Sequence, residues 1–235
     1  MQELIANELE LLGITHSRDA LIKLSEFAEL VKAGNKRFNL TAIKEDADFA
    51  KKHFADSLSV LKLDDIAGAG RLIDIGSGAG FPGVPLAIMM PQTNVLMVDS
   101  TNKKIEFILS AIEKLGLKNA QAIAARAEDI AHNPLYREKF DIAVSRAVAP
   151  LNVLTEMALP FVKKGGVMIA YKGTAAMSER IAAQKAAEVC GGKIHGVYPS
   201  NVSELDHYFV VIKKIKETDG FYPRNFSAIK KKPIV

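Results

Sequence analysis

The 235-residue chain contains no tryptophan and a single cysteine, Cys190. One cysteine excludes an intrachain disulfide and every cysteine-rich zinc module. No set of histidine, cysteine and carboxylate residues has the spacing of a metal site, so we expect no bound metal. A chain with so little cysteine is typical of a reducing compartment, and the prediction is a cytoplasmic protein.

Long apolar runs are also missing. No stretch reaches the roughly 18–20 apolar residues that are needed to cross a bilayer. The first twelve residues carry Glu3, Glu8 and Glu10, so they predict an amphipathic helix and not a signal peptide. We therefore expect no association with a membrane.

Acidic residues are scarce at the end of the chain. The last 23 residues hold seven basic and two acidic side chains, a net charge of +5, whereas the whole chain carries +4. The basic ones are Lys213, Lys214, Lys216, Arg224, Lys230, Lys231 and Lys232. A basic tail suits a polyanion such as nucleic acid, and RNA contact is the prediction. The alternatives are a solvated tail, or one that folds back on the core through Phe221, Tyr222 and Ile234.

Hydrophobic pattern and charge divide the chain into three parts. They are an N-terminal helical extension (1–70), a core (71–215) and a basic tail (216–235). Apolar residues in the extension recur at three- and four-residue spacing, which predicts helices. The expected helices are 1–12, a second from Ser17 or Asp19 to a stop signal at Gly34-Asn35, and 46–61.

From Arg71 onward, short β-rich runs alternate with helix-length segments, a pattern typical of a parallel sheet with crossover helices. The expected strands are 71–75, 94–99, 120–124, 141–145, 166–171, 193–197 and 207–213. The expected helices are 82–90, 102–115, 151–162 and 175–190. Only a turn-rich segment joins the last two strands, so they run antiparallel. The prediction is an α/β fold with a seven-stranded, mostly parallel sheet and one strand reversed near the edge.

A glycine-rich loop follows the first predicted strand and opens a helix. It contains Asp74, Gly76, Gly78 and Gly80 in the pattern D-x-G-x-G-x-G, and such glycines let the backbone approach a ligand closely. A dinucleotide site needs G-x-G-x-x-G, but Phe81 occupies the third glycine position; no G-K-[ST] follows either, which excludes a Walker site. Asp74 suits the ammonium group of a methionine moiety. The pattern thus resembles the S-adenosylmethionine (AdoMet) loop of Rossmann-like methyltransferases.

Two acidic residues further along agree with a nucleoside-containing ligand. Asp99 ends the second strand, 23 positions after Gly76, about where an acidic residue meets ribose hydroxyls. Glu128 follows the third strand and can accept a hydrogen bond from an adenine amino group, with the backbone of Ala127 and Glu128 along the ring. The alternatives are a helix cap for Asp99 and a surface charge for Glu128.

Several separated motifs together resemble one family. They are FNLT (38–41), HFADS (53–57), DIGSGAGFPGVP (74–85), DIAVSRA (141–147), YPR (222–224) and KKP (231–233). In this order they resemble the RsmG (GidB) family, the bacterial 16S ribosomal RNA guanine-N7 methyltransferases, over nearly the whole chain. The resemblance implies AdoMet contacts at Gly76, Phe81, Ala127, Glu128 and Arg146, and a target guanine near the decoding centre of the small subunit. The chain departs from the family pattern at His207, where many members have arginine, and in the tail segment 225–229.

The target atom can be narrowed by exclusion. Methylation of cytosine C5 needs a cysteine nucleophile, but Cys190 lies late in a predicted helix, far from the loop, as a buried thiol would. Methylation of an exocyclic amine usually uses an (Asp/Asn)-Pro-Pro-aromatic motif after the fourth strand, and this chain has Ser145-Arg146-Ala147-Val148 there. Guanine N7 has a free lone pair and needs no general base, so the lack of an acid–base pair agrees with N7 chemistry.

Arg146 lies at the end of the fourth predicted strand, where ligands bind in open α/β sheets. It can contact the cofactor, donate to guanine O6 or hold a phosphate, and a structural salt bridge is the alternative. His53, Asp56 and Ser57 share one helical face, where they either cap the cofactor pocket or form hydrogen bonds among the N-terminal helices.

The combined expectation is a Rossmann-like AdoMet-dependent methyltransferase sandwich with an N-terminal helical extension. We expect a monomer that acts on 16S ribosomal RNA or the small ribosomal subunit, with Arg146 as the catalytic residue. The expected cofactor-binding residues are Asp74, Gly76, Gly78, Phe81, Asp99, Ala127, Glu128 and Arg146. The alternatives are a methyltransferase for a small molecule or protein, and a non-catalytic RNA- or ribosome-binding protein that kept the fold.

Overall fold

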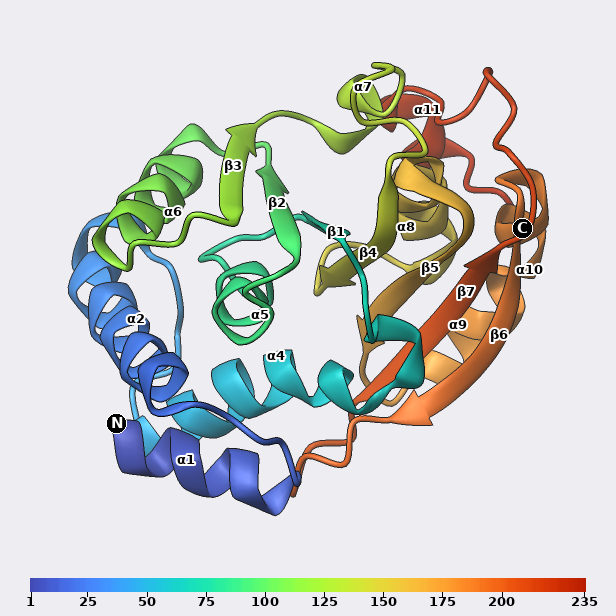
Figure 1. Ribbon diagram of the computed structural model, residues 1–235. Helices are drawn as coiled ribbons and strands as arrows, with labels where there is room; N and C mark the ends of the chain where they lie inside the picture. Colours follow the sequence, from blue (N-terminus) through green and yellow to red (C-terminus); the bar gives the residue numbers. More distant parts are fainter.

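The computed structural model describes the backbone of all 235 residues and every side chain except that of Lys36. Its centre is a seven-stranded sheet with the order β3-β2-β1-β4-β5-β7-β6 (Figure 1). The strands are β1 (Arg71–Ile75), β2 (Asn94–Asp99), β3 (Ala120–Ala124), β4 (Phe140–Arg146), β5 (Val162–Lys172), β6 (Gly192–Pro199) and β7 (Tyr208–Lys214). The first five strands are parallel, and β7 runs antiparallel to both of its neighbours. The predicted α/β sheet with one reversed strand near the edge is confirmed.

Helices cover both faces of the sheet, because side chains of successive strand residues point to opposite faces. The α-helices are α1 (Gln2–Leu11), α2 (Arg18–Phe38), α3 (Asp46–Phe49), α4 (Asp56–Leu58), α5 (Gly83–Met89), α6 (Asn102–Lys114), α7 (Ala127–Ile130), α8 (Leu151–Ala158), α9 (Ala176–Ala182), α10 (Gln184–Val189) and α11 (Phe226–Lys231). The helices of the N-terminal part, with α5 and α6, pack on the face that holds Leu72 and Met97. Helices α7 to α11 lie on the face that holds Ile73 and Leu96, which gives three layers (Figure 1).

The N-terminal extension is helical, as predicted, and its third helix changes type along its length. After α3 comes a π-helical turn, Ala50–Ala55, followed by α4 and a 3-10 turn, Ser59–Lys62. π-Helical turns are frequent at functional sites. This one precedes Asp56 directly. Among the described residues, no helix is both long enough and apolar enough to span a bilayer.

Helix α2 extends past the predicted stop at Gly34-Asn35 and ends at Phe38, with Asn39 in the left-handed conformation at φ 50°. The stop prediction was wrong because Gly34 serves packing and not helix termination. A Cβ atom on Gly34 would lie 2.9 Å from Cε2 of Phe107, which α6 places against this helix. The apolar residues that follow the three- and four-residue spacing on α2 are buried: Leu21, Leu24, Phe27, Ala28 and Val31.

Other predicted bounds changed where tertiary contacts outweigh helix propensity. The helix expected over 151–162 ends at Ala158, and after a 3-10 turn Val162 already belongs to β5. The helix expected over 175–190 is divided at Ala183 into α9 and α10. On the first helix, Ile5 and Leu9 are fully buried, whereas Leu11 is 77% exposed. The short helices α7 and α11 were not predicted.

The C-terminal tail folds back on the core, so the folding-back alternative describes its backbone correctly. Nη2 and Nε of Arg224 donate to the fully buried carboxylate of Glu156 at 2.6 and 2.8 Å. Ile229 of α11 is fully buried, whereas Phe221, an expected anchor, is 67% exposed. Lys214 is buried too, where its Nζ donates to the carbonyl of Leu159 and the hydroxyl of Thr218. The side chains of Lys230, Lys231 and Lys232 remain exposed.

We expect Gly34→Ala to destabilise the protein although alanine is the better helix former. Alanine gains about 1 kcal/mol of helix propensity, whereas overpacking a core contact costs about 1–3 kcal/mol. Phe107 cannot easily move, because its ring packs on those of Phe27 and Phe38 at 6.5 and 6.0 Å. Urea unfolding should show a lower midpoint, and a raised midpoint would contradict this packing. Gly220→Ala, where a new Cβ atom meets nothing within 4 Å, is the control.

Candidate functional site

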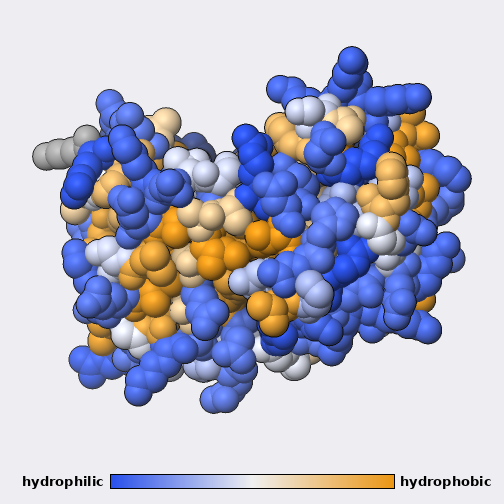
Figure 2. Space-filling view, turned by 90° about the horizontal axis from the view of Figure 1, so that it is seen from above, coloured by the Kyte–Doolittle hydropathy of each residue, from blue (hydrophilic) through white to orange (hydrophobic). Residues whose placement is uncertain are grey.

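A pocket of about 280 Å³ opens at the carboxyl ends of β1, β2, β3 and β4. This is the edge of an open α/β sheet at which ligands bind. Four of the predicted cofactor-binding residues line it: Gly76, Asp99, Ala127 and Glu128. Figure 2 views the molecule from the side of α7 and α11 and shows hydrophilic side chains around a face with apolar atoms gathered in its middle.

The glycine loop leaves open space beside its backbone. Gly78 has φ 59°, a left-handed conformation that favours glycine, and its N–H donates to Oδ2 of Asp99 at 3.0 Å. A Cβ atom on Gly78 would have the carbonyl of Gly76, 3.9 Å away, as its nearest neighbour. The loop is therefore held from one side and lies open where a ligand can approach.

Asp99 connects the loop to the start of α6. Its Oδ2 accepts from Gly78, and its Oδ1 accepts from the backbone N–H of Thr101 at 2.9 Å. Nζ of Lys104 lies 3.7 Å from the same carboxylate. Thr101, and not Asp99, is the N-cap residue of α6, so Asp99 holds the turn before the helix while its carboxylate lines the pocket.

Glu128 is buried in the pocket wall, so its interpretation as a surface charge was wrong. It is 3% exposed, and its Oε1 finds no hydrogen-bond partner among the described residues. Burial raises the pKa of this carboxyl group. Nη1 of Arg126 lies 3.7 Å from this oxygen, too far for a hydrogen bond, so Oε1 can still accept one from a ligand that brings a donor, such as an adenine amino group. Ala127 lies beside it in the same wall.

Asp74 and Phe81 lie behind the loop and not in the pocket wall. Oδ2 of Asp74 accepts a hydrogen bond from the N–H of Gly83 at 2.9 Å, and Oδ1 has no hydrogen-bond partner in the described residues. Burial raises the pKa of Asp74 to about 7. The ring of Phe81 stacks on His53 at 4.5 Å and lies 5.1 Å from the ring of Phe27. Asp74 thus connects the loop to the start of α5, and Phe81 connects it to the N-terminal helices.

A second cavity, of about 370 Å³, adjoins the first and shares Ala147 and Val148 with it. Arg146, at the end of β4, lies in its wall with Asp56, Tyr171 and His207. Nη1 of Arg146 donates to Oδ2 of Asp56 at 2.8 Å, so the predicted alternative of a salt bridge is present. Burial works to raise the pKa of Asp56, but the hydrogen bond from His207 and the charge of Arg146 hold it below its usual range.

The HFADS motif contributes Asp56 to the wall of this second cavity, and its other polar residues bond within the protein. Nε2 of His53 is 2.7 Å from the hydroxyl of Thr41, and burial lowers the pKa of His53 to about 4, so the ring is neutral at physiological pH. The carbonyl of Ser57 accepts from the hydroxyl of Tyr171 at 2.8 Å. These contacts favour the hydrogen-bonding interpretation of the motif, with Asp56 alone reaching the cavity.

No pattern in the sequence indicates that the C-terminal tail contributes to the first pocket. Phe226 of α11 lines that pocket, and the guanidinium of Arg126 lies 5.5 Å from its ring centroid. Neither residue belongs to a recognisable motif. Cys190, in contrast, is buried as expected, and burial raises the pKa of its thiol to about 12, which excludes it as a nucleophile.

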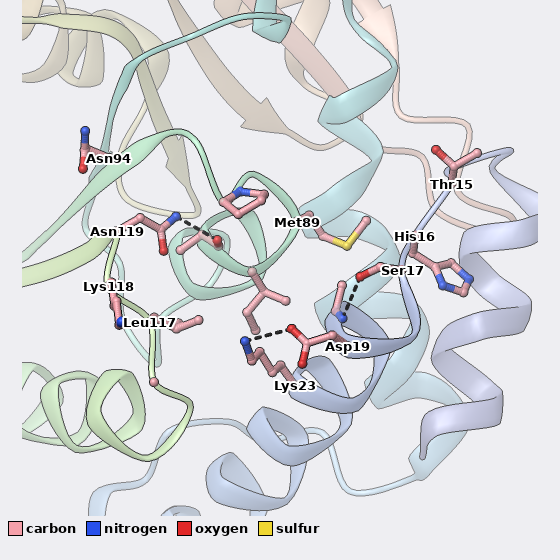
Figure 3. Close-up of a pocket in the computed structure, with 15 residues that line it drawn as sticks. Thr15, His16, Ser17, Asp19, Lys23, Met89, Asn94, Leu117, Lys118 and Asn119 are labelled. Atoms are coloured by element: carbon pink, nitrogen blue, oxygen red, sulfur yellow. Dashed lines mark hydrogen bonds and ion pairs between the residues drawn. The ribbon is translucent and has the colours of Figure 1, made fainter.

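A larger hollow, of about 640 Å³, lies at the opposite edge of the sheet, where β2 and β3 begin (Figure 3). In Figure 3, dashed lines join Ser17, Asp19, Lys23 and Asn119 to partners in the protein, whereas the buried Nδ1 of His16 has no hydrogen-bond partner among the described residues. The amide of Asn119 donates to the carbonyl of Ala87, Ser17 caps α2 by accepting from Ala20, and Asp19 pairs with Lys23. These contacts hold the start of α2 in place, and none of the predicted cofactor-binding residues lines this hollow, so the candidate site is the carboxyl edge.

A family model for "rRNA small subunit methyltransferase G" (GidB) matches residues 20–206, well over half of the chain. The chain belongs to this family. Curated members from two clostridia resemble it over most of its length. One from Clostridium beijerinckii is 43% identical over 234 residues and covers 99% of this chain and 98% of its own. One from Clostridium botulinum (strain ATCC 19397 / Type A) is 46% identical over 214 residues and covers 90% of each chain. Both are named "Ribosomal RNA small subunit methyltransferase G".

Solved structures share the fold of this GidB-family chain. A SAM-dependent methyltransferase from Aquifex aeolicus has a TM-score of 0.55 at 16% identity, covering 80% of this chain and 98% of its own. Fibrillarin from Aeropyrum pernix, solved with natively bound S-adenosyl-L-methionine, has a TM-score of 0.53 at 14% identity and covers 67% and 72%. The predicted Rossmann-like methyltransferase sandwich is confirmed. Among the described side chains, no group of three or more histidine, cysteine or carboxylate residues is placed to hold a metal ion.

We expect Asp74→Asn to flatten the pH dependence of stability. Asp74 has a pKa of about 7 in the fold and about 3.9 when unfolded, so between these values the folded state binds the extra proton. The free energy of unfolding should therefore fall as pH rises from 4 to 7, by at most about 1.4 kcal/mol per pH unit from this group. Urea unfolding of both proteins at pH 5, 6, 7 and 8 checks this, and parallel pH curves would contradict it.

We expect Gly78→Val to abolish AdoMet binding in a folded protein. The valine side chain would enter the open space beside the loop, and its left-handed backbone should cost about 1–2 kcal/mol of stability. Calorimetric titration with AdoMet measures the loss. Gly68→Val is the matched control, because Gly68 has φ 73° and a Cβ atom there meets nothing within 4 Å. Normal AdoMet affinity in folded Gly78→Val would remove the loop from the cofactor site.

Proposed function

We propose that this chain transfers a methyl group from AdoMet to N7 of a guanine in 16S ribosomal RNA, as a cytoplasmic monomer without a metal ion. The observation that carries the proposal is the pair of adjoining cavities at the carboxyl edge of the sheet. One cavity carries the predicted nucleoside-binding residues and the other carries Arg146. The wall that they share is where a methyl group would pass from cofactor to base.

The residues of the first cavity suit AdoMet. Gly76, Asp99, Ala127 and Glu128 would hold it, with Gly78 shaping the loop and with Asp74 and Phe81 supporting the loop from behind. The buried Oε1 of Glu128 gains a donor if it faces the adenine amino group. When bound, AdoMet supplies an electrophilic methyl group, whose transfer to N7 moves a positive charge from sulfur to the base.

The second cavity supplies what N7 methylation requires. Guanine N7 carries its own lone pair, so the protein must align the base and does not need to remove a proton. Guanine presents the acceptors O6 and N7 on one edge, and an arginine is the usual partner of such an edge. Arg146 is therefore the proposed catalytic residue, since its donors can hold O6 while N7 meets the methyl group.

The position and charge of the C-terminal tail favour RNA as the substrate. Phe226 of α11 lines the cofactor pocket, and Lys230, Lys231 and Lys232 follow it with exposed side chains. Lysines in that place can bind phosphates beside the target base, which position an RNA without reading its sequence.

Labelled AdoMet tests the proposal directly. The protein is incubated with small ribosomal subunits, or with naked 16S RNA, from a strain that lacks the modification, and the labelled base is mapped. Label at N7 of one guanine is the expected result, and comparison of the two substrates identifies the preferred one. Label on a protein or small molecule instead would support the first alternative. AdoMet binding without methyl transfer would support a non-catalytic protein.

We expect replacement of Lys230, Lys231 and Lys232 by glutamine to weaken RNA binding and its salt dependence. Three lost phosphate contacts on single-stranded RNA should flatten the slope of log K against log salt by about 2. AdoMet affinity should stay the same. Titration of RNA at several salt concentrations measures the slope.

The matched control replaces three other exposed lysines by glutamine. Lys114, Lys118 and Lys139 lie toward the amino edge of the sheet. An equal loss in both triple variants would assign the effect to net charge alone, which contradicts a specific role for the tail.

A further inference from the structure

A buried carboxylate joins two side chains of the Arg146 cavity. Asp56 is 1% exposed, and each of its oxygens has a different partner. Its Oδ2 accepts from Nη1 of Arg146 at 2.8 Å, and its Oδ1 is 2.8 Å from Nδ1 of His207. Because a buried carboxylate is an acceptor, His207 carries a proton on Nδ1 whether its ring is neutral or charged.

The contact of His207 limits how Arg146 can pair with Asp56. An arginine beside a free carboxylate usually forms two parallel hydrogen bonds, which use two of its nitrogens and both oxygens. Here Oδ1 is taken, so Arg146 uses Nη1 alone for Asp56, and the same nitrogen also donates to the carbonyl of Lys52 at 3.0 Å. Nη2 has only a long contact, 3.5 Å, with Nδ1 of His53.

We propose that His207 is a positioning residue for Arg146. By occupying Oδ1 of Asp56, it leaves N–H donors of the Arg146 guanidinium free to bind the target guanine. Without His207, the buried Oδ1 would lack a partner, and the guanidinium would turn to pair with both oxygens. The donors that should hold O6 of the base would then bond to Asp56. This inference rests on the proposed function and adds to it a residue that acts through Arg146.

Three substitutions separate this role from others. His207→Ala removes the contact with Asp56. His207→Asn restores a donor near the position of Nδ1, whereas His207→Gln places its amide nearer the position of Nε2. The control is His195→Ala on β6, an exposed histidine outside both cavities.

Methyl transfer to undermethylated small subunits is the readout, with kcat and KM for the subunit measured separately. We expect His207→Ala and His207→Gln to lower kcat about tenfold or more, with KM and AdoMet affinity changed less than about twofold. His207→Asn should recover kcat to within about threefold of the wild type, and His195→Ala should match the wild type. If His207→Ala fails to fold, the comparison of His207→Asn with His207→Gln decides.

A double-variant cycle tests whether His207 acts through Arg146. In the Arg146→Ala background, His207→Ala should change kcat by less than about twofold, because the residue it positions is already gone. Multiplying losses would overturn the inference and assign His207 a direct contact with the RNA. Equal activity of His207→Asn and His207→Gln would also overturn it. If the wild type transfers no methyl group, the proposed function fails; if it does and the losses multiply, this inference alone fails.

Discussion

The ion pair between Asp56 and Arg146 connects the N-terminal helices to the carboxyl edge of the sheet, and the candidate site depends on it. A carboxylate that is 1% exposed is stable only if its oxygens have partners, and these come from β4 and from the segment before β7. Three distant parts of the chain therefore meet at one group. The N-terminal helices thus contribute Asp56 to the wall of the second cavity in addition to covering the sheet.

The glycine loop is held to the same helices from its other side. The ring of Phe81 lies among those of Phe27, His53 and Phe54, at 5.1, 4.5 and 5.4 Å, and the guanidinium of Arg146 lies 5.6 Å from its centre. Aromatic packing of this kind contributes beyond simple burial. The loop, the second cavity and the N-terminal helices are therefore parts of one packed unit, which holds the two cavities side by side.

Sequence reasoning succeeded where local pattern decides the structure. The bounds of β1, β2 and β3 were predicted to the residue, because parallel strands are apolar runs between turn signals. Prediction failed where a contact with a distant part of the chain determines the structure. Gly34 leaves room for the ring of Phe107 inside a continuous helix. Glu128 is buried in a pocket that is also lined by the tail helix α11, and the hydrophobic pattern did not predict that helix. The position of His207 opposite Asp56 spans 151 residues, a contact that spacing along the chain cannot predict. The glycine loop and Arg146, in contrast, lie at the predicted sheet edge because strand ends fix them.

The proposed function places the cofactor in one cavity and the target base in its neighbour. A crystal structure of the protein with S-adenosylhomocysteine and a guanine nucleotide tests this assignment most directly. We expect the nucleoside of the cofactor product against Asp99 and Glu128, and the guanine between Arg146 and Tyr171, with N7 toward the sulfur across Ala147 and Val148. Cofactor density in the hollow beside Asn119, or a guanine bound away from Arg146, would contradict it.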